Sequence, residues 1–138
     1  LRFAEFSDAT VNMVRQQAPA WMNVKNPLDV GPSGLFGTGL ETVLRDDRVQ
    51  GVMAIPVIPS AIIESAVKQG FGPELLFGNP EQIRVALPEK PVVTYTIGSR
   101  YWMSLMRKLF GPYMTLVSSA ETAAKALCAL HRYHRFRD

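Results

Sequence analysis

The residues best suited to chemistry lie in a short turn that joins an extended run to a helical pattern. The turn consists of Gly31, Pro32, Ser33 and Gly34, and the amphipathic pattern begins near Leu35. Such a junction points backbone N–H groups and the positive end of a helix dipole at one place, which suits an anion. Gly31, Ser33, Gly34 and Leu35 are therefore candidates for a phosphate-binding site. Short glycine patterns often occur by chance, so the residues alone favour the interpretation that the glycines only turn the chain.

Two charged residues are predicted to support this site. Asp29 precedes the turn, where its carboxylate can accept a hydrogen bond from the backbone in an Asx turn. Arg100 follows a second apolar run that ends at Gly98. A parallel sheet would bring Arg100 to the same carboxyl edge, where open α/β folds bind ligands. Asp29 is thus expected to shape the turn, and Arg100 is a candidate cation for the anion.

We predict no catalytic nucleophile and no metal ligand in this sequence. The two histidines, His131 and His134, lie among arginines in the final helical pattern and lack a glycine setting. Cys128 stands in an alanine- and leucine-rich run, where a small packing residue is expected. The basic, aromatic end of the chain could touch nucleic acid. Cations that offset the dipole of a helix C-terminus explain it more simply, so we expect no nucleic-acid partner.

The composition is that of one globular domain. The chain has 138 residues, of which 47% are hydrophobic and 20% charged, and its net charge is +3. No apolar run approaches the roughly 20 residues that span a bilayer. The first residues have no leader-like apolar region. A single cysteine excludes an internal disulfide and favours a reducing compartment. We therefore expect a cytoplasmic protein without a membrane partner.

Hydrophobic periodicity predicts alternating helices and strands. Apolar, β-branched runs indicate four strands, at Leu28–Val30, Val49–Ile55, Val92–Ile97 and Tyr113–Leu116. Helices are expected at about residues 7–17, 35–47, 61–69, 80–87, 99–110 and from 118 onward. This order predicts an α/β fold, with a parallel sheet and helices on both of its faces. The chain opens on a helix, so the first strand of such a sheet is predicted to be missing.

Several local details accompany this prediction. Trp21 and Met22 are expected to be buried. Gly37 and Gly39 are expected to delay the second helix until about Thr38. The last helix is expected to open on a capping box, from Ser118 to Glu121. Either Tyr101 or Trp102 is expected to face the core.

Four motifs along the chain carry a family resemblance. They are Asn26-Pro27-Leu28-Asp29-Val30 with the glycine turn, Asp46-Asp47-Arg48-Val49-Gln50-Gly51-Val52-Met53, Lys90-Pro91-Val92-Val93 with Gly98, and Ser118-Ser119-Ala120-Glu121-Thr122-Ala123-Ala124-Lys125-Ala126-Leu127 followed by Ala129-Leu130 and Tyr133. Their order resembles the NDP-forming acyl-CoA synthetases of the succinyl-CoA ligase superfamily, over about residues 7–135. The match is to the flavodoxin-like ligase domain of these enzymes. It implies a three-layer, flavodoxin-like (succinyl-CoA ligase-like) domain over residues 1–138.

The resemblance implies part of a synthetase that makes acyl-CoA, ADP and phosphate from an acid, CoA and ATP. In such enzymes a histidine of another domain carries the phosphoryl group, and the helix N-terminus after the Asp-Val strand stabilises that phosphohistidine. Carried over here, the stabilising residues are Gly31, Ser33, Gly34 and Leu35. CoA and ATP with Mg²⁺ are implied for the full enzyme, although this segment alone is expected to bind no cofactor. The implied partners are CoA-binding and ATP-grasp domains or subunits, and a homo-oligomer is possible. The chain alone is expected to be inactive.

The sequence also departs from the family pattern. Pro32 removes one N–H donor from a loop that often carries more glycine, and the Ser33 hydroxyl can replace it. The family's domain begins with a glycine-rich strand and helix, which have no counterpart here ahead of residue 7. Their absence would leave apolar strand edges exposed. We therefore expect a fragment of a larger polypeptide, or a sheet that another chain completes.

Two other functions stay open at this point. The same ligase-like fold occurs fused to protein acetyltransferases, where it would act as a non-catalytic regulatory domain that senses a CoA ester or a nucleotide. An FMN-binding flavodoxin-like protein has only the fold in its favour. The loop is short and lacks the usual run of hydroxyl residues.

Overall fold

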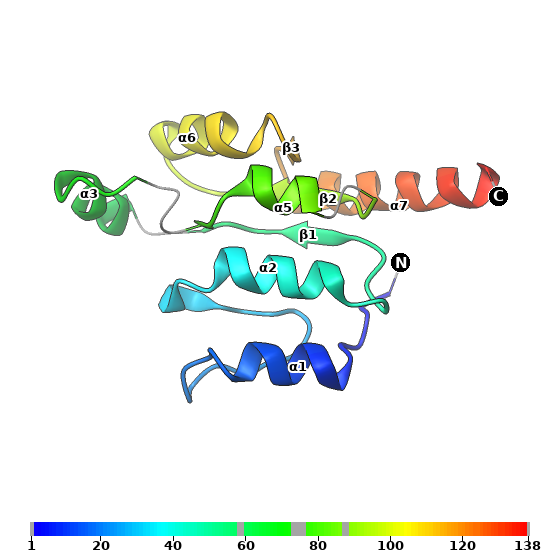
Figure 1. The fold of residues 1–138 in the computed structure, drawn as a ribbon. Helices are drawn as coiled ribbons and strands as arrows, with labels where there is room; N and C mark the ends of the chain where they lie inside the picture. Colours follow the sequence, from blue (N-terminus) through cyan, green and yellow to red (C-terminus); the bar gives the residue numbers. More distant parts are fainter. Residues whose placement is uncertain (1, 58–59, 73–76, 87–88, 138) are drawn as a thin grey trace.

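Helices and strands alternate along the chain, as the sequence predicts (Figure 1). The computed structural model describes residues 2–57, 60–72, 77–86 and 89–137. Its elements are α1 (Asp8–Arg15), the 3₁₀ turn η1 (Gly31–Ser33), α2 (Phe36–Arg45), β1 (Val52–Ala54), α3 (Ser60–Lys68), α5 (Pro80–Ala86), β2 (Val92–Tyr95), α6 (Arg100–Phe110), β3 (Thr115–Val117) and α7 (Ala120–Arg137). None of the described helices has the length and apolar character needed to cross a bilayer.

The strands form a parallel sheet in the order β1-β2-β3. Val52 is paired with Val92, and Val93 is paired with Thr115. The middle strand, β2, is covered on both faces, since Val93 and Thr94 have no exposed surface. A strand buried on both faces needs a continuous apolar run, and this is why the run that begins at Val92 was recognisable in the sequence.

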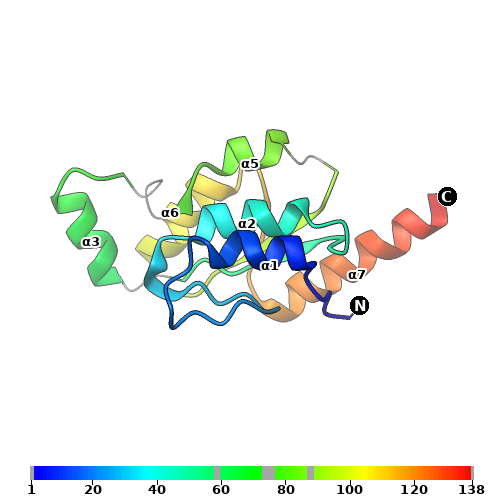
Figure 2. The same ribbon diagram turned by 60° about the horizontal axis from the view of Figure 1, so that its bottom comes forward.

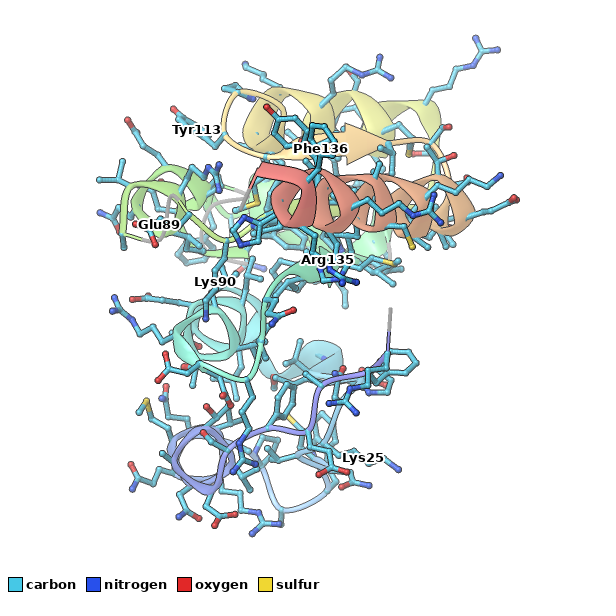
Figure 3. The ribbon with its side chains drawn as sticks, turned by 90° about the vertical axis from the view of Figure 1, so that its right-hand side faces the viewer. Lys25, Glu89, Lys90, Tyr113, Arg135 and Phe136 are labelled. Atoms are coloured by element: carbon cyan, nitrogen blue, oxygen red, sulfur yellow. The ribbon has the colours of Figure 1, made fainter. Side chains whose placement is uncertain are left out.

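The sheet lies between two layers of helix. On one face, α2, α5 and α6 share a hydrophobic core with β1 and β2. Its buried members are Leu40, Leu44, Ala54, Ile63, Phe77, Ile83, Val92, Trp102, Met106, Phe110 and Met114. On the other face, α7 packs on all three strands, and Ala123 is fully buried there. Figure 3 shows α2 and α5 on one side of the sheet and α7 on the other. The parallel three-layer α/β fold is therefore confirmed.

A second, smaller hydrophobic cluster lies beside the first, under α1. Val14, Met22 and Val24 are its buried members, and Leu28, Val30 and Leu35 pack against it. Between Met22 and Val30, side chains alternate between inward and exposed positions, as in an extended segment with one packed face. Helix α2 links the two clusters, because Leu40 belongs to the first while Gly39 lies against Leu28 and Val30 of the second.

The prediction of a strand at Leu28–Val30 is wrong. The segment is extended, but no strand in the described ranges pairs with it. Extended conformation follows from the local sequence, whereas a strand also needs a backbone partner, which α2 cannot provide. The other three strands exist and are shorter than predicted or shifted, at Val52–Ala54, Val92–Tyr95 and Thr115–Val117.

Three local predictions are also corrected. Helix α2 begins at Phe36, within one residue of the predicted range and not near Thr38, and Gly37 in its first turn packs against the backbone of Phe77 and Gly78. Ser119, and not Ser118, caps α7, since its Oγ accepts from the Thr122 N–H at 3.1 Å. Trp21 is 59% exposed, although Met22 is buried as predicted.

Several predictions about the remaining helices are confirmed. The helices expected from residues 7 and 99 begin there, where Ser7 and Ser99 cap α1 and α6. Trp102 is the residue that faces the core, whereas Tyr101 is exposed. The predicted helix over residues 80–87 is α5, although residue 87 lies outside the described residues.

A buried carboxylate ties the start of α1 to the end of α2. Asp46 accepts hydrogen bonds from the backbone N–H groups of Ser7 (2.7 Å) and Arg48 (2.9 Å). The Lys90 Nζ donates to the Asp46 carbonyl oxygen at 2.7 Å, and Figure 3 shows Lys90 pointing that way. Burial alone would raise the pKa of Asp46, but the backbone N–H groups of Ser7 and Arg48 and the hydroxyls of Thr10 and Ser7 outweigh it and lower the pKa to about 2.

This carboxylate predicts a pH dependence of stability. The pKa of Asp46 is lower in the folded state than its ordinary value of 3.8, so the ionised form favours folding. The stabilisation is complete above about pH 4 and is lost as the pH falls through 2. Asp46→Asn should lower the free energy of unfolding by about 2 kcal/mol at pH 7 and flatten its pH dependence below pH 4. Urea titrations at several pH values measure both effects. Asp47→Asn, at the exposed neighbour, is the control, and equal effects would contradict the assignment.

The two glycines of α2 should respond differently to alanine. A Cβ on Gly37 would stand 2.7 Å from the Phe77 oxygen and 2.9 Å from the Gly78 Cα, whereas one on Gly39 would make ordinary contacts at 3.5 Å. Gly37→Ala should therefore destabilise the fold by about 2 kcal/mol. Gly39→Ala should be neutral or stabilising by up to about 1 kcal/mol, because alanine favours helix. Denaturant unfolding compares the two, and a reversed order would show that α2 does not pack as described.

Candidate functional site

The predicted anion loop is folded around its own hydrogen bonds. Asp29 Oδ1 accepts from the Gly31 N–H at 3.0 Å, which is the Asx turn that the sequence predicts. The Ser33 N–H donates to the Val30 carbonyl oxygen at 3.1 Å, and the Leu35 N–H donates to Ser33 Oγ at 3.2 Å. Three of the four predicted N–H donors thus have acceptors within the loop.

Backbone N–H groups without an acceptor follow the loop, at the start of α2. The first backbone hydrogen bond of α2 runs from the Gly39 N–H to the Leu35 carbonyl, so the N–H groups of Phe36 and Thr38 precede it. No side chain caps this helix. By contrast, Ser7, Ser99 and Ser119 cap α1, α6 and α7. Together with the Gly34 N–H, the start of α2 therefore presents unpaired donors among the described residues.

The conformation of the loop requires glycine at its two turning points. Gly31 has φ of +44° and Gly34 has φ of +78°. Residues other than glycine rarely adopt such positive φ angles. Nothing lies within 4 Å of the position that a Cβ of Gly34 would occupy, so this side of the loop is open to a ligand.

Trp21 is a neighbour of the loop that sequence reasoning missed. A Cβ on Gly31 would stand 3.1 Å from the Trp21 ring, so the indole lies against the loop although it is largely exposed. An aromatic residue in an irregular segment has no periodicity that could have revealed this contact. Trp21 thus covers one side of the turn and leaves the side of Gly34 free.

Arg100 lies at the same edge of the sheet but not in the loop. It is exposed at the first position of α6, after the carboxyl end of β2. In Figure 1 the starts of α2 and α6 are at the same end of the sheet. No hydrogen bond or ion pair joins Arg100 to the loop within the described residues, and β1 lies between their positions.

Two buried hydrogen bonds that share the Thr96 hydroxyl fix this carboxyl edge. Thr96 Oγ1 donates to the Pro56 carbonyl oxygen at 2.6 Å and accepts from Trp102 Nε1 at 3.0 Å. These two hydrogen bonds connect the ends of β1 and β2 to α6. Both polar side chains are satisfied in the core, which favours one rigid arrangement of this edge.

The histidines lie far from the loop. His131 and His134 belong to the second half of α7, which extends past the rest of the chain at the opposite, amino edge (Figure 2). Cys128 is a half-buried free thiol on the same helix. No group of three potential metal ligands gathers in the described part of the chain. The polar groups described at the loop are thus its backbone N–H groups, the Asp29 carboxylate and the Ser33 hydroxyl, and the two histidines lie away from it.

Comparison with known proteins gives two similarities. No family model matches the sequence. The ADP-forming acetate–CoA ligase II of Archaeoglobus fulgidus is 39% identical over 61 residues, which cover 39% of this chain and 9% of that enzyme. The crystal structure of PH0766 from Pyrococcus horikoshii OT3 has a TM-score of 0.63 and 21% identity over 91% of this chain and 28% of that one. The chain thus spans a small part of either relative.

The two similarities agree with the order of motifs in the sequence. The acetate–CoA ligase is an enzyme of the expected class, and the structure of PH0766 supports the fold over nearly the whole chain. The parallel sheet is present, as the resemblance implies. Over 61 residues the chain is similar to an ADP-forming acetate–CoA ligase, and its fold is similar to that of PH0766.

Proposed function

We propose that the chain is a ligase-type domain of an acyl-CoA synthetase, which converts acid, CoA and ATP to acyl-CoA, ADP and phosphate. Its own contribution is the N-terminus of α2, which stabilises a phosphohistidine or phosphate that another domain presents. The observation that carries this proposal is the uncapped start of α2 directly after the Gly34 turn. The similarity to an ADP-forming ligase favours this role over that of a regulatory sensor.

Physical chemistry supports such a role for a site without a base. A phosphoryl group carries nearly two negative charges at neutral pH. Oriented N–H groups and a helix dipole stabilise that charge without any proton transfer, and they need no rearrangement when the group arrives. The helix supplies these donors at a fixed position, because Gly37 locks it against the backbone of Gly78.

The hydrogen bonds within the loop separate the residues that shape it from the residues whose donors are available to an anion. The N–H groups of Gly34, Phe36 and Thr38 and the Ser33 hydroxyl hydrogen are the donors that we assign to the anion. Gly31 and Leu35 hold the shape of the loop through Asp29 and Ser33. The Asp29 carboxylate opposes an anion at close range, so the anion should sit on the Gly34 side of the turn.

Other parts of the synthetase must supply what this segment lacks. We assign the transferring histidine, the CoA site and the ATP site with Mg²⁺ to CoA-binding and ATP-grasp domains or subunits. The carboxyl edge of the sheet is where such a domain would present its phosphoryl group. Arg100, at that same edge, is a second contact for a large anionic ligand.

A charge placed at Ser33 tests the anion site. Ser33→Asp should weaken phosphate binding at least about tenfold, since two like charges a few ångströms apart repel by more than 1 kcal/mol. Ser33→Asn is the matched control. Both side chains can accept the Leu35 N–H, but Asn adds no charge. Phosphate titration monitored by the amide resonances of Gly34, Phe36 and Thr38 measures the affinity. Equal binding by the two variants, or no response at these amides, would remove the assigned role.

The chain alone should not catalyse acyl-CoA synthesis. Its two histidines are at the opposite edge of the sheet, so neither can accept a phosphoryl group at the loop. An assay of CoA thiol consumption with ATP, Mg²⁺ and acetate should give no rate above background. Clear turnover by the isolated chain would contradict the assignment of the transferring histidine, the CoA site and the ATP site to other domains or subunits.

A further inference from the structure

The second half of α7 stands away from the rest of the described structure. The first half packs on the sheet through Ala123, which is fully buried, whereas every residue from Ala129 to Phe136 is exposed. Figures 1 and 2 show this half extending past the other elements. A helix of about two turns is marginal in water unless it packs an apolar face against something. A partner that covers this half of α7 would therefore stabilise it.

An apolar seam runs along this part of α7. It consists of Ala126, Ala129, Tyr133 and Phe136, which follow one another at intervals of three, four and three residues. These are the intervals of the a and d positions of a heptad, so the four side chains form one narrow stripe. Phe136 is 88% exposed and Tyr133 is 61% exposed. The stripe thus has the spacing of a helix–helix contact, and its two aromatic members are uncovered.

The seam does not face the sheet. Helix α7 packs on the sheet through Ala123 and Leu127, and a Cβ on Gly51 would stand 3.4 Å from the Leu127 Cδ2. Successive residues of a helix are turned by about 100°, so Ala123 and Leu127 lie roughly 100–140° around the axis from the centre of the seam. The seam is therefore directed away from the surface on which α7 packs.

The flanks of the seam are basic. Lys125 and Arg132 occupy the g positions beside it, and Arg135 lies further around the helix, at a c position. Figure 3 shows Arg135 and Phe136 on different sides of α7. From residue 122 to residue 136 the sequence of α7 contains no acidic residue. Lys125 pairs with Glu121 at 2.7 Å, but both side chains are largely exposed, so this ion pair is weak. A surface that covers the seam needs negative charge to match these flanks.

Spacing and charge together separate the possible partners. A second copy is disfavoured, because two antiparallel α7 helices would place Lys125 and Arg132 opposite like charges. A parallel pair would also set two positively charged helices side by side. A membrane surface suits a broad apolar face, whereas this seam is narrow. Nucleic acid would use the cations but not an aromatic stripe at heptad spacing. An acidic helix matches both the seam and its flanks.

We propose that the second half of α7 docks an acidic amphipathic helix of a partner protein. The partner helix places large apolar side chains on Ala126 and Ala129 and smaller ones against Tyr133 and Phe136, so that the two surfaces interdigitate. Its carboxylates lie opposite the two cations at the g positions. The contact is at the amino edge of the sheet, so it leaves the start of α2, at the carboxyl edge, accessible.

A synthetic helix tests the docking surface on the 138-residue chain. The probe is a labelled peptide of about three heptads with Leu at a and d and Glu at e and g, and the matched control peptide has Lys at e and g. Fluorescence anisotropy should show that the chain binds the Glu peptide at least about tenfold more tightly than the Lys peptide. Bound Glu peptide should also slow amide exchange from Leu130 to Phe136 at least about tenfold and leave Val93 unchanged, because it stabilises only this half of α7.

Matched substitutions locate the contact. Arg132→Glu, beside the seam, should weaken binding of the Glu peptide at least about fivefold, whereas Arg135→Glu, away from the seam, should weaken it less than about twofold. Phe136→Ser should weaken binding at least about tenfold, because it removes a seam side chain. Val85→Ser is its control, since Val85 is 75% exposed but lies on α5. All four residues are exposed, so the variants should keep the fold.

Four results would overturn the proposal. No binding of the Glu peptide would show that the seam does not dock a helix. Equal effects of the two charge reversals would show an attraction that depends only on net charge. Tighter binding to duplex DNA, or to vesicles of phosphatidylcholine and phosphatidylserine in equal amounts, would assign this half of α7 to a nucleic acid or to a membrane. A dimer of the chain that protects the same amides without any peptide would make a second copy the partner.

Discussion

The close packing of α2, against backbone on one side and against side chains on the other, is the constraint on which the rest of the structure depends. Gly37 touches the Phe77–Gly78 backbone, and Gly39 lies against Leu28 and Val30. A side chain at Gly37 would push the helix away from the core, since packed interiors have no room to absorb an added methyl group. The same contacts fix the start of α2 at the carboxyl edge of the sheet. The candidate site is thus positioned by glycine packing and not by bonds within the site.

In the proposed function, the anion site and the histidine that carries the phosphoryl group belong to different parts of the protein. Backbone donors stabilise a charge that arrives from elsewhere, whereas a nucleophilic histidine needs a base or a charge beside it. Here the histidines stand at the amino edge and the glycine turn stands at the carboxyl edge. A group shuttled between domains fits this arrangement, because the receiving site then needs only complementarity to phosphate and a rigid position.

The sequence predicted the features that depend on nearby residues. The helix starts at residues 7 and 99, the buried β2 run and the Asx turn at Asp29 all arise from neighbours within a few positions. Pairing of Leu28–Val30 could not be judged in this way, because it depends on a backbone partner distant in the sequence. The contact of Trp21 with Gly31 is likewise non-local.

The inward hydrogen bonds of the loop depend on particular side-chain orientations at Asp29 and Ser33, which residue types alone do not specify. The glycine pattern therefore predicted the turn before α2 but could not separate N–H donors that shape the turn from N–H donors that remain available. Leu28–Val30 carries this turn, and its described contacts are side-chain packing against α2 and α1. Side-chain packing permits small shifts along the segment, whereas a ladder of backbone hydrogen bonds fixes its register.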